Sequence, residues 1–408
     1  LYACLSCLLV FVCIIQGIYL NNKYHTYEQI FIQIYCYYAY VFDYSLNFVY
    51  NLREMVVFKG MRDFNYSKIR DQKWDSDILA YIAAIYKEMG KQEQYLKQRS
   101  AELEKLVEIA KIQSTEASNA IEGIVTTNTR IKQLVEEKTT PRNRDEQEIA
   151  GYRDVLNIIH DSFDTISVTR NYILQLHKIM YNHMNNPMAG KIKNVQNYIS
   201  VKYLDGHTET LFTPLAPFET AEALDKICEE YNRVIGNFEV EPLIAIPIFI
   251  HDFLCIHPFN DGNGRISRLL TTLLLYKNGF YVGKYISLEA KIAQNKDLYY
   301  DALNRSQNGW LDGSEDIIPF IKYLLGIILS AYKDFEDRFF IIETKLPAVE
   351  IVKKATQNKL GKFTKQEIWE LCPSLSISSI EGSLRKLVES GELERKGSGK
   401  ATYYVRLK

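Results

Sequence analysis

Two apolar helical segments joined by a glycine-rich loop constrain this chain more than any other feature of its sequence. The first segment, PLIAIPIFIHDFLCI, covers 242–256, and the loop HPFNDGNGRISR covers 257–268. Apolar residues then recur at helical spacing: Ile266, Leu269, Leu270, Leu273 and Leu274. This spacing predicts that the loop leads directly onto the N-terminus of a second apolar helix.

The residue types in this loop suit a phosphate-bearing ligand. A helix N-terminus presents free N–H groups and a positive dipole potential, which favour a bound anion. Gly262 and Gly264 allow the backbone to approach such a ligand closely, and Asn263 adds an amide donor. Arg265 and Arg268 are three residues apart, so both lie on one helical face and can clamp phosphate oxygens.

Two further residues of the loop supply chemistry. Asp261 offers a hard oxygen ligand for Mg²⁺ carried by a nucleotide. His257 can act as a general base near neutral pH. A base, a metal ligand, an anion cradle and two guanidinium groups within twelve residues indicate a nucleotide-transfer site.

The order H-x-F-x-D-G-N-G-R-x-x-R resembles the signature of the Fic family, also called Fic/Doc or Fido. These enzymes move AMP, or occasionally another phosphate-containing group, from a nucleotide onto a protein hydroxyl. All signature positions match, at His257, Phe259, Asp261, Gly262, Asn263, Gly264, Arg265 and Arg268. The resemblance covers residues 65–340 and implies a mainly α-helical catalytic core.

The resemblance also implies a role for each position. His257 would deprotonate the target hydroxyl, and Asp261 would hold Mg²⁺ against the α- and β-phosphates of ATP. Arg268 would reach the γ-phosphate, and Phe259 would anchor the loop in the core. The remaining positions would cradle the phosphates: Gly262, Asn263, Gly264 and Arg265.

The alternating segment YISVKYLDGHTETLF (198–212) predicts a β-hairpin with Asp205-Gly206 at its turn. It resembles the family's flap, although it is longer than the shortest versions. The resemblance implies that the first strand, with Ile199, Ser200 and Val201, lies near the nucleotide. The second strand would align the target segment by strand addition, through Thr210, Leu211 and Phe212.

Two other segments match family patterns. Tyr299 and Tyr300 in NKDLYYDAL resemble a tyrosine pair that lines the adenine pocket of related enzymes; the alternative is one packed and one exposed helix position. SNAIEG (118–123) resembles the family's inhibitory pattern, with Ser118 and Glu122 on one side of a helix before Gly123. In related enzymes this glutamate pairs with the second motif arginine, here Arg268, and occupies the γ-phosphate position. In some relatives it also orients water for removal of AMP.

The body is expected to be mainly helical with this one hairpin. Apolar spacing predicts a helix from Trp74 and another through Leu96–Ile112 that ends near Gly123, a C′ glycine. We divide the body into an N-terminal helical region with the inhibitory helix (61–150) and a Fic catalytic core (151–340). Further helices are predicted over 220–236, 242–256, 264–278, 289–306 and 315–343.

Residues 345–408 form a separate unit with 13 Lys and Arg against 7 Asp and Glu, a net charge of +6. We expect a helix from Val349, a strand around Phe363, a helix over 365–372, a third helix with Ser378 as its N-cap, and two strands within 392–407. This order is typical of a winged helix-turn-helix. Such a unit binds DNA or serves as a docking or dimerisation module.

Residues 1–60 differ from the rest, with six charged and fifteen aromatic residues. Residues 1–20 carry no charge, about the length of a membrane span, but a basic region before them and a cleavage site after them are missing. We interpret 1–60 as a non-native extension, with a membrane anchor and an ordinary N-terminal helix as alternatives.

Composition limits the function classes. The 408 residues contain 49 Lys and Arg against 50 Asp and Glu, so overall charge does not indicate a polyanionic partner. Three scattered cysteines beyond residue 36 fit a reducing compartment. The resemblance to the Fic family implies a bacterial protein adenylyltransferase that uses ATP and Mg²⁺, acts on a protein substrate or on itself, and forms a homodimer. With the cysteine usage, we expect it to be cytoplasmic. The alternative is a DNA-binding transcriptional regulator whose Fic body senses a nucleotide or a partner.

Overall fold

The fold is taken from a computed structural model that describes residues 62–407, except 98–99, 203–206, 344–346, 358–360 and 373–374. The expectations for residues 1–60 and for the turn at Asp205-Gly206 lie outside these residues. Within the described part of the chain, no helix has both the length and the apolar character that a membrane crossing requires.

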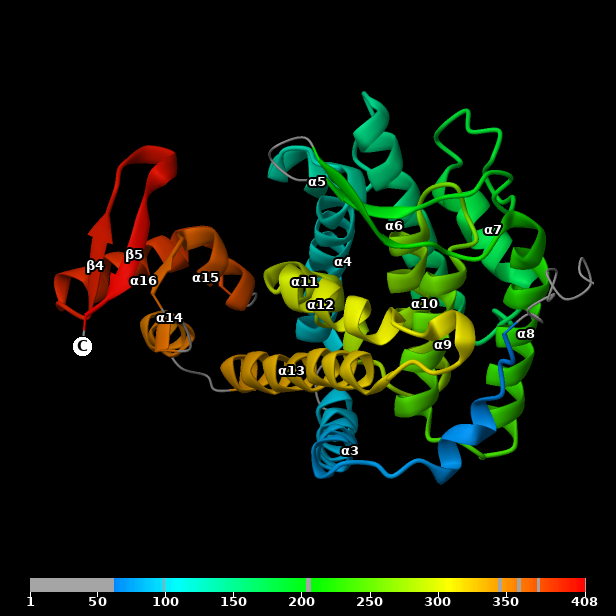
Figure 1. The fold of residues 1–408 in the computed structure, drawn as a ribbon. Coiled ribbons are helices and arrows are strands. Elements are labelled where there is room, and N and C mark those ends of the chain that lie inside the picture. Colours follow the sequence, from blue (N-terminus) through cyan, green and yellow to red (C-terminus); the bar gives the residue numbers. More distant parts are fainter. Residues whose placement is uncertain are drawn as a thin grey trace, which may run out of the picture. The chain divides into compact units, whose positions relative to one another are not determined.

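The body is mainly helical, as the sequence predicts (Figure 1). Its N-terminal helices are α3 (Ser76–Leu96), α4 (Ser100–Ile121), α5 (Asn128–Val135), α6 (Arg144–Ser162) and α7 (Arg170–Met180). After a hairpin follow α8 (Pro217–Gly236), α9 (Pro242–Ile256), α10 (Asn263–Lys277), α11 (Leu288–Gln294), α12 (Lys296–Gln307) and α13 (Ile318–Glu343). Short 3₁₀ helices lie at Tyr66–Asp71, Val282–Lys284 and Trp310–Asp312.

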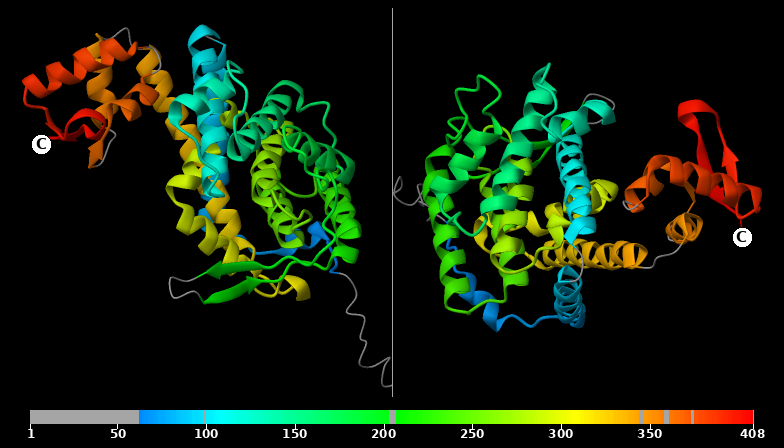
Figure 2. Two further views of the ribbon diagram at one scale, coloured as in Figure 1. Left: turned by 90° about the horizontal axis from the view of Figure 1, so that it is seen from above. Right: turned by 180° about the vertical axis from the view of Figure 1, so that it is seen from behind.

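The two apolar helices that flank the glycine-rich loop form the centre of this body. All residues of α9 from Leu243 to Ile256 are buried, because α8, α10 and α13 pack around it. Helix α10 is buried in the same way and also contacts α4 and α6 (Figures 1 and 2). The loop between α9 and α10 is therefore attached at both ends to the most buried part of the fold.

The predicted hairpin is present as β1 (Ile199–Lys202) and β2 (Thr208–Phe212), which pair antiparallel. Ile199 lies opposite Phe212 and Ser200 opposite Thr210, with a bulge between Ile199 and Ser200. Most side chains of both strands are exposed.

One prediction about the body is wrong, and one helix of the body was not predicted. The single helix predicted over 289–306 is two helices, because Asn295 leaves helical geometry with φ −130° and ψ 47° and separates α11 from α12. Helix α5, which the sequence analysis did not predict, has Thr127 as its N-cap and buries Ile131 and Leu134.

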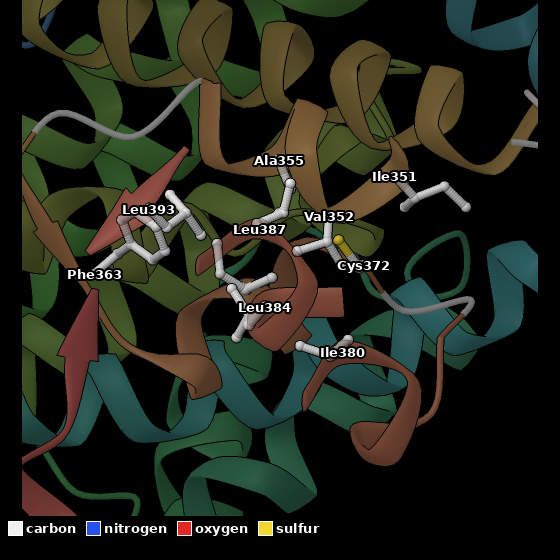
Figure 3. Close-up of a cluster of buried hydrophobic side chains, with 10 residues drawn as sticks. Ile351, Val352, Ala355, Phe363, Cys372, Ile380, Leu384, Leu387 and Leu393 are labelled. Atoms are coloured by element: carbon white, nitrogen blue, oxygen red, sulfur yellow. The ribbon is translucent and has the colours of Figure 1, made fainter. Parts of the chain in front are cut away.

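The C-terminal unit contains α14 (Ala348–Gln357), α15 (Lys365–Leu371) and α16 (Ile377–Glu389) with a three-stranded antiparallel sheet. The strands β3 (Lys362–Phe363), β4 (Leu393–Lys396) and β5 (Tyr403–Arg406) lie in the order β3-β5-β4. Its apolar core is Ile351, Val352, Ala355, Phe363, Ile368, Cys372, Ile380, Leu384, Leu387 and Leu393 (Figure 3).

The N-cap predicted for the third helix of this unit is wrong by two positions. Ser376, not Ser378, accepts a hydrogen bond from the backbone N–H of Ser379, so α16 begins at Ile377. Serines at 376, 378 and 379 are all suitable caps, and the choice depends on where the chain enters the helix.

Buried histidines make the stability of the fold sensitive to acid. Burial lowers the pKa of His160 and of His251 to about 3 and that of His177 to about 4, against an ordinary value of about 6.5. Below about pH 6.5 the unfolded chain therefore binds protons that the folded chain does not. Each such proton lowers the free energy of unfolding by about 1.4 kcal/mol for each pH unit.

We predict that the melting temperature falls between about pH 6.5 and about pH 5, before most carboxylates titrate. Thermal unfolding followed by circular dichroism measures this effect. His160→Phe keeps a ring against Tyr276 and removes one titrating group, so its melting temperature should depend less on pH. The same pH dependence in both proteins would contradict the account.

Candidate active site

The non-helical part of the segment 257–268, from His257 to Gly262, begins and ends with left-handed backbone conformations. Helix α9 ends at Ile256, and His257 follows with φ 53° and ψ 63°. Gly262, with φ +84°, precedes the first residue of α10. This φ favours glycine, and a Cβ at Gly262 would also come 2.6 Å from Cε of Met180 and displace the end of that side chain.

His257 is held as a neutral imidazole. Its Nδ1 lies 3.2 Å from the carbonyl oxygen of Leu254, which can only accept a hydrogen bond, so Nδ1 carries the proton and Nε2 keeps its lone pair. Burial lowers the pKa of His257 to about 4, so the ring is unprotonated near neutral pH. This is the protonation state that a general base needs.

Two residues fasten the middle of the loop. Asn263 accepts a hydrogen bond from the N–H of Phe259 at 2.9 Å and donates one to the carbonyl of Phe259 at 2.8 Å. The fully buried Phe259 ring stacks on His177 with centroids 3.7 Å apart, so the anchoring role expected of Phe259 agrees with its place in the core.

His177 on α7 is a positioning residue that the sequence analysis did not single out. Its Nδ1 accepts a hydrogen bond from the N–H of Gly190, so its Nε2 donates to the carbonyl of Asp261, 3.1 Å away. His177 therefore fixes the loop next to the candidate metal ligand. No local pattern signals this, because Asp261 lies 84 residues away in sequence.

Arg265 is engaged by protein side chains. Its Nη1 lies 2.7 Å from Oε2 of Glu148 on α6, and its Nη2 donates to the hydroxyl of Tyr181 at 2.9 Å. The side chain is 1% exposed and its Nη2 lies 3.8 Å from the carboxylate of Asp261. Glu148, which the sequence analysis did not single out, thus sets the position of Arg265.

Arg268 lies in a buried site formed by the end of helix α4. Its Nε donates to Oγ of Ser118, and its Nη2 donates both to the carbonyl of Ser118 and to Oε1 of Glu122, each at 2.8 Å. Burial disfavours the charged guanidinium, but the carboxylate of Glu122 outweighs it and holds the pKa of Arg268 above its ordinary value.

Glu122 is the C-cap residue that follows Ile121, the last residue of α4. Gly123 has φ +81°, the N–H of Ile124 bonds to the carbonyl of Asn119, and that of Gly123 bonds to Ala120, which is a Schellman motif. The predicted C′ glycine is thus confirmed. A carboxylate at a helix C-terminus is disfavoured by the helix dipole, so Glu122 depends on its pairing with Arg268.

The carboxylate of Glu122 lies close to Gly264, in the first turn of α10. A Cβ at Gly264 would lie 2.4 Å from Oε1 of Glu122, so a larger residue there would displace this carboxylate. Across the same helix end, Nζ of Lys296 on α12 donates to the carbonyl of Ile121 at 2.6 Å.

The other candidate residues lie on α12 and the hairpin. Tyr299 is buried, and burial raises its pKa to about 12, whereas Tyr300 is 45% exposed. Strand β2 contacts α12, and the ring of Phe212 lies edge-on to Trp310, with centroids 6.2 Å apart. Ser200, Val201, Thr210 and Leu211 are exposed, and Ile199 and Phe212 are half-buried.

Asp261 has the properties of a magnesium ligand. Its side chain is 59% exposed, and its Oδ1 accepts a hydrogen bond from the N–H of Gly262 at 2.7 Å. In the described part of the chain, no three His, Cys, Asp or Glu side chains are grouped as a metal site. Mg²⁺ commonly takes one or two carboxylates together with substrate phosphates and water, so Asp261 fits an ion that arrives with a nucleotide.

Comparisons with known proteins agree with this geometry. The model of the Fic/DOC family matches residues 167–275, which include α7, the hairpin, α9, the loop and most of α10. Protein adenylyltransferase Fic from Nematostella vectensis is 26% identical over 235 residues, which cover 55% of this chain and 48% of that protein. Protein adenylyltransferase fic-1 from Caenorhabditis elegans is 26% identical over 186 residues, 44% of this chain and 32% of that protein. The chain thus spans less than half the length of either relative.

A solved structure shares the fold. The crystal structure of a Fic family protein from Desulfovibrio desulfuricans G20 superposes with a TM-score of 0.54 at 20% identity and covers 83% of this chain and 97% of that one. The resemblance first drawn from residues 257–268 is therefore confirmed for residues 167–275, which match the Fic/DOC family.

Proposed function

We propose that this protein transfers AMP from ATP to a hydroxyl side chain of a target protein and that Glu122 inhibits the transfer. The observation that carries the proposal is the pairing of Glu122 with Arg268 beside a loop that holds a neutral histidine. Two relatives named protein adenylyltransferase support the reaction type.

The base in the proposed reaction is Nε2 of His257. It takes the proton of the target hydroxyl while the oxygen attacks the α-phosphorus of ATP. The bond from the α-phosphorus to the bridging oxygen breaks, and diphosphate leaves. The bond between Nδ1 and the carbonyl of Leu254 keeps Nε2 unprotonated and supports the imidazolium that forms.

The N-terminus of α10 supplies the anion site. Its first N–H groups, at Asn263, Gly264 and Arg265, have no partner within the helix and point along a positive dipole. Because Arg265 is held by Glu148, its charge acts at a fixed place beside Asp261. Asp261 would hold Mg²⁺, which would neutralise charge on the phosphates of ATP.

Glu122 would act by occupying the guanidinium that the γ-phosphate requires. With Arg268 paired to Glu122, the γ-phosphate would be displaced and the α-phosphate misaligned for in-line attack. The same carboxylate could orient water for removal of AMP from a modified target.

The hairpin is proposed to dock the target segment. Strand β2 pairs with β1 on one side, and among the described residues no strand pairs with its other edge. An extended peptide could add to this edge, next to Thr210, Leu211 and Phe212. On the opposite strand, Ile199, Ser200 and Val201 are proposed to lie near the nucleotide, and Tyr299 and Tyr300 to line the adenine site.

A second candidate function concerns the C-terminal unit. Helices α15 and α16 with the sheet β3-β5-β4 have the element order of a winged helix-turn-helix, and 345–408 carries a net charge of +6. We propose that this unit binds DNA or a protein partner, with α16 in the recognition position. A regulator of this kind could also modify itself or a neighbour.

Replacement of the base is the first test. His257→Ala should lower AMP transfer by on the order of 100- to 10,000-fold, because proton abstraction contributes that much. ATP affinity and the circular dichroism spectrum should stay unchanged. Labelled ATP with Mg²⁺ and mass spectrometry of the product give the rate. A folded His257→Ala protein that still transfers AMP at the normal rate would remove the assigned mechanism.

Release of the inhibitor is the second test. Glu122→Gly should raise AMP transfer by on the order of 100-fold, since misplacement of about 1 Å costs that much, and should lower any AMP removal. Glu136→Gly is a matched control, because Glu136 is also a helix C-cap and does not contact Arg268. Arg268→Ala should not activate, since it removes the phosphate clamp as well. Equal transfer by wild type and Glu122→Gly at saturating ATP would show that 118–123 is only a helix end.

The C-terminal unit should be dispensable for the chemistry, because the candidate catalytic residues all precede α13. Deletion of 345–408 should preserve transfer and abolish any salt-dependent DNA binding, measured by fluorescence anisotropy at two salt concentrations. Full-length protein that shows no salt-dependent binding would leave the regulator hypothesis without its main support.

A further inference from the structure

Lys193 is a buried lysine next to the candidate base that the mechanism above does not use. It lies in the irregular segment between α7 and β1 and is 2% exposed. Its Nζ donates to the carbonyl of Ile256 at 3.0 Å and to Oδ1 of Asn197 at 3.1 Å. Its backbone N–H donates to the carbonyl of Pro258 at 2.8 Å.

These bonds bracket His257. The carbonyl of Ile256 belongs to the peptide group that precedes His257, and that of Pro258 belongs to the residue that follows it. Rotation of the first peptide group sets the φ of His257, which is 53°. A left-handed conformation at a residue with a Cβ costs roughly 1–2 kcal/mol, so it persists only where neighbouring contacts hold it.

Asn197 extends this clamp. It receives a bond from Nζ of Lys193 and donates through Nδ2 to the carbonyl of Phe259 at 3.0 Å. One short segment thus binds the carbonyls of Ile256, Pro258 and Phe259, which surround the base.

The charge on Lys193 is not explained by an ion pair. The hydrogen-bond partners of its Nζ are neutral oxygens, and no carboxylate among the described residues forms a salt bridge with it. The C-terminus of α9 favours a cation through the helix dipole, but burial lowers the pKa of Lys193 to about 8. A buried cation without a counter-ion costs free energy that an apolar side chain would not, which indicates a role beyond packing.

We propose that Lys193 is a positioning residue for His257 that fixes the left-handed backbone of the base and places a positive charge beside it. The inference rests on the proposed function for its effect on catalysis. The charge and the orientation of the ring can be measured without catalysis.

Three charged groups face His257. Burial is the main cause of its low pKa, and Lys193 lowers it further, whereas Glu122 and Asp261 raise it. Loss of the lysine charge should therefore shift the pKa of His257 upward.

The test compares Lys193→Met, Lys193→Arg and the matched control Lys191→Met, all in the full-length chain. Lys191 is also a lysine and lies two residues away, but it is exposed and its side chain does not take part in the bonds around His257. His257 is titrated by NMR on histidine-labelled protein, with its signal assigned by its loss in His257→Ala. AMP transfer is measured in the Glu122→Gly background, so that inhibition does not mask the rates.

We expect Lys193→Met to raise the pKa of His257 and to lower kcat by tenfold or more at an unchanged KM for ATP. Lys193→Arg should restore both at least partly, because it keeps a donor and a positive charge, and Lys191→Met should match its parent. Should Lys193→Met not fold, Lys193→Gln replaces it with the same expectations.

An unchanged pKa of His257 in folded Lys193→Met or Lys193→Gln would overturn the inference, as would a kcat of either variant within twofold of the parent. If the Glu122→Gly parent transfers no AMP, the proposed function fails, and the titration of His257 still decides the role of Lys193.

Discussion

The ion pair between Arg268 and Glu122 is the interaction on which the rest of the account depends. Arg268 is 4% exposed, and its guanidinium cannot be left without partners, since an unpaired buried charge costs several kcal/mol. Ser118 supplies two of its acceptors and Glu122 supplies the charge. Under the proposed function, a γ-phosphate is the only other anion that takes this place, so the same buried arginine explains both inhibition and substrate binding.

The remainder of the site is built to keep the loop rigid. Helices α9 and α10 are buried along their length, so both ends of the loop are fixed. His177 and Asn263 hold its interior, and Glu148 holds Arg265 from α6. Preorganised groups of this kind lower the cost of aligning a phosphate for attack. The positioning groups are drawn from helices far apart in the sequence, so under the proposed function the helical body has a direct role in the chemistry.

The sequence allowed prediction of those features that are encoded locally. The loop is recognisable because eight fixed positions lie within twelve residues, and the apolar spacing of α9 and α10 marks the helices on either side. The helix end at Gly123 is indicated by a glycine after a run of helical spacing. The hairpin at 198–212 is indicated by alternating residues on either side of an Asp-Gly pair. Helix α5 and the break at Asn295 were not predicted, because short helices and single-residue breaks depend on local capping and burial.

The residues that position the site could not be predicted from local patterns. His177 binds a loop carbonyl 84 residues away, and Lys193 binds the carbonyl at the end of α9, 63 residues away. Glu148 on α6 pairs with Arg265 on α10. Each of them is an ordinary helix or loop residue until the tertiary fold brings it to the loop. Ser118 and Glu122 were found only because their spacing matches an inhibitory pattern, and their contact with Arg268 needed the structure.

Crystal structures of the wild type and Glu122→Gly with Mg²⁺ and a nonhydrolysable ATP analogue test the central claim most directly. The quantity to compare is the distance from the guanidinium of Arg268 to the γ-phosphate. The account predicts that Arg268 binds the γ-phosphate in Glu122→Gly, and that in the wild type it stays on Glu122 with the γ-phosphate elsewhere. A wild-type complex in which Arg268 binds Glu122 and the γ-phosphate together, with the α-phosphate placed as in the variant, would contradict it.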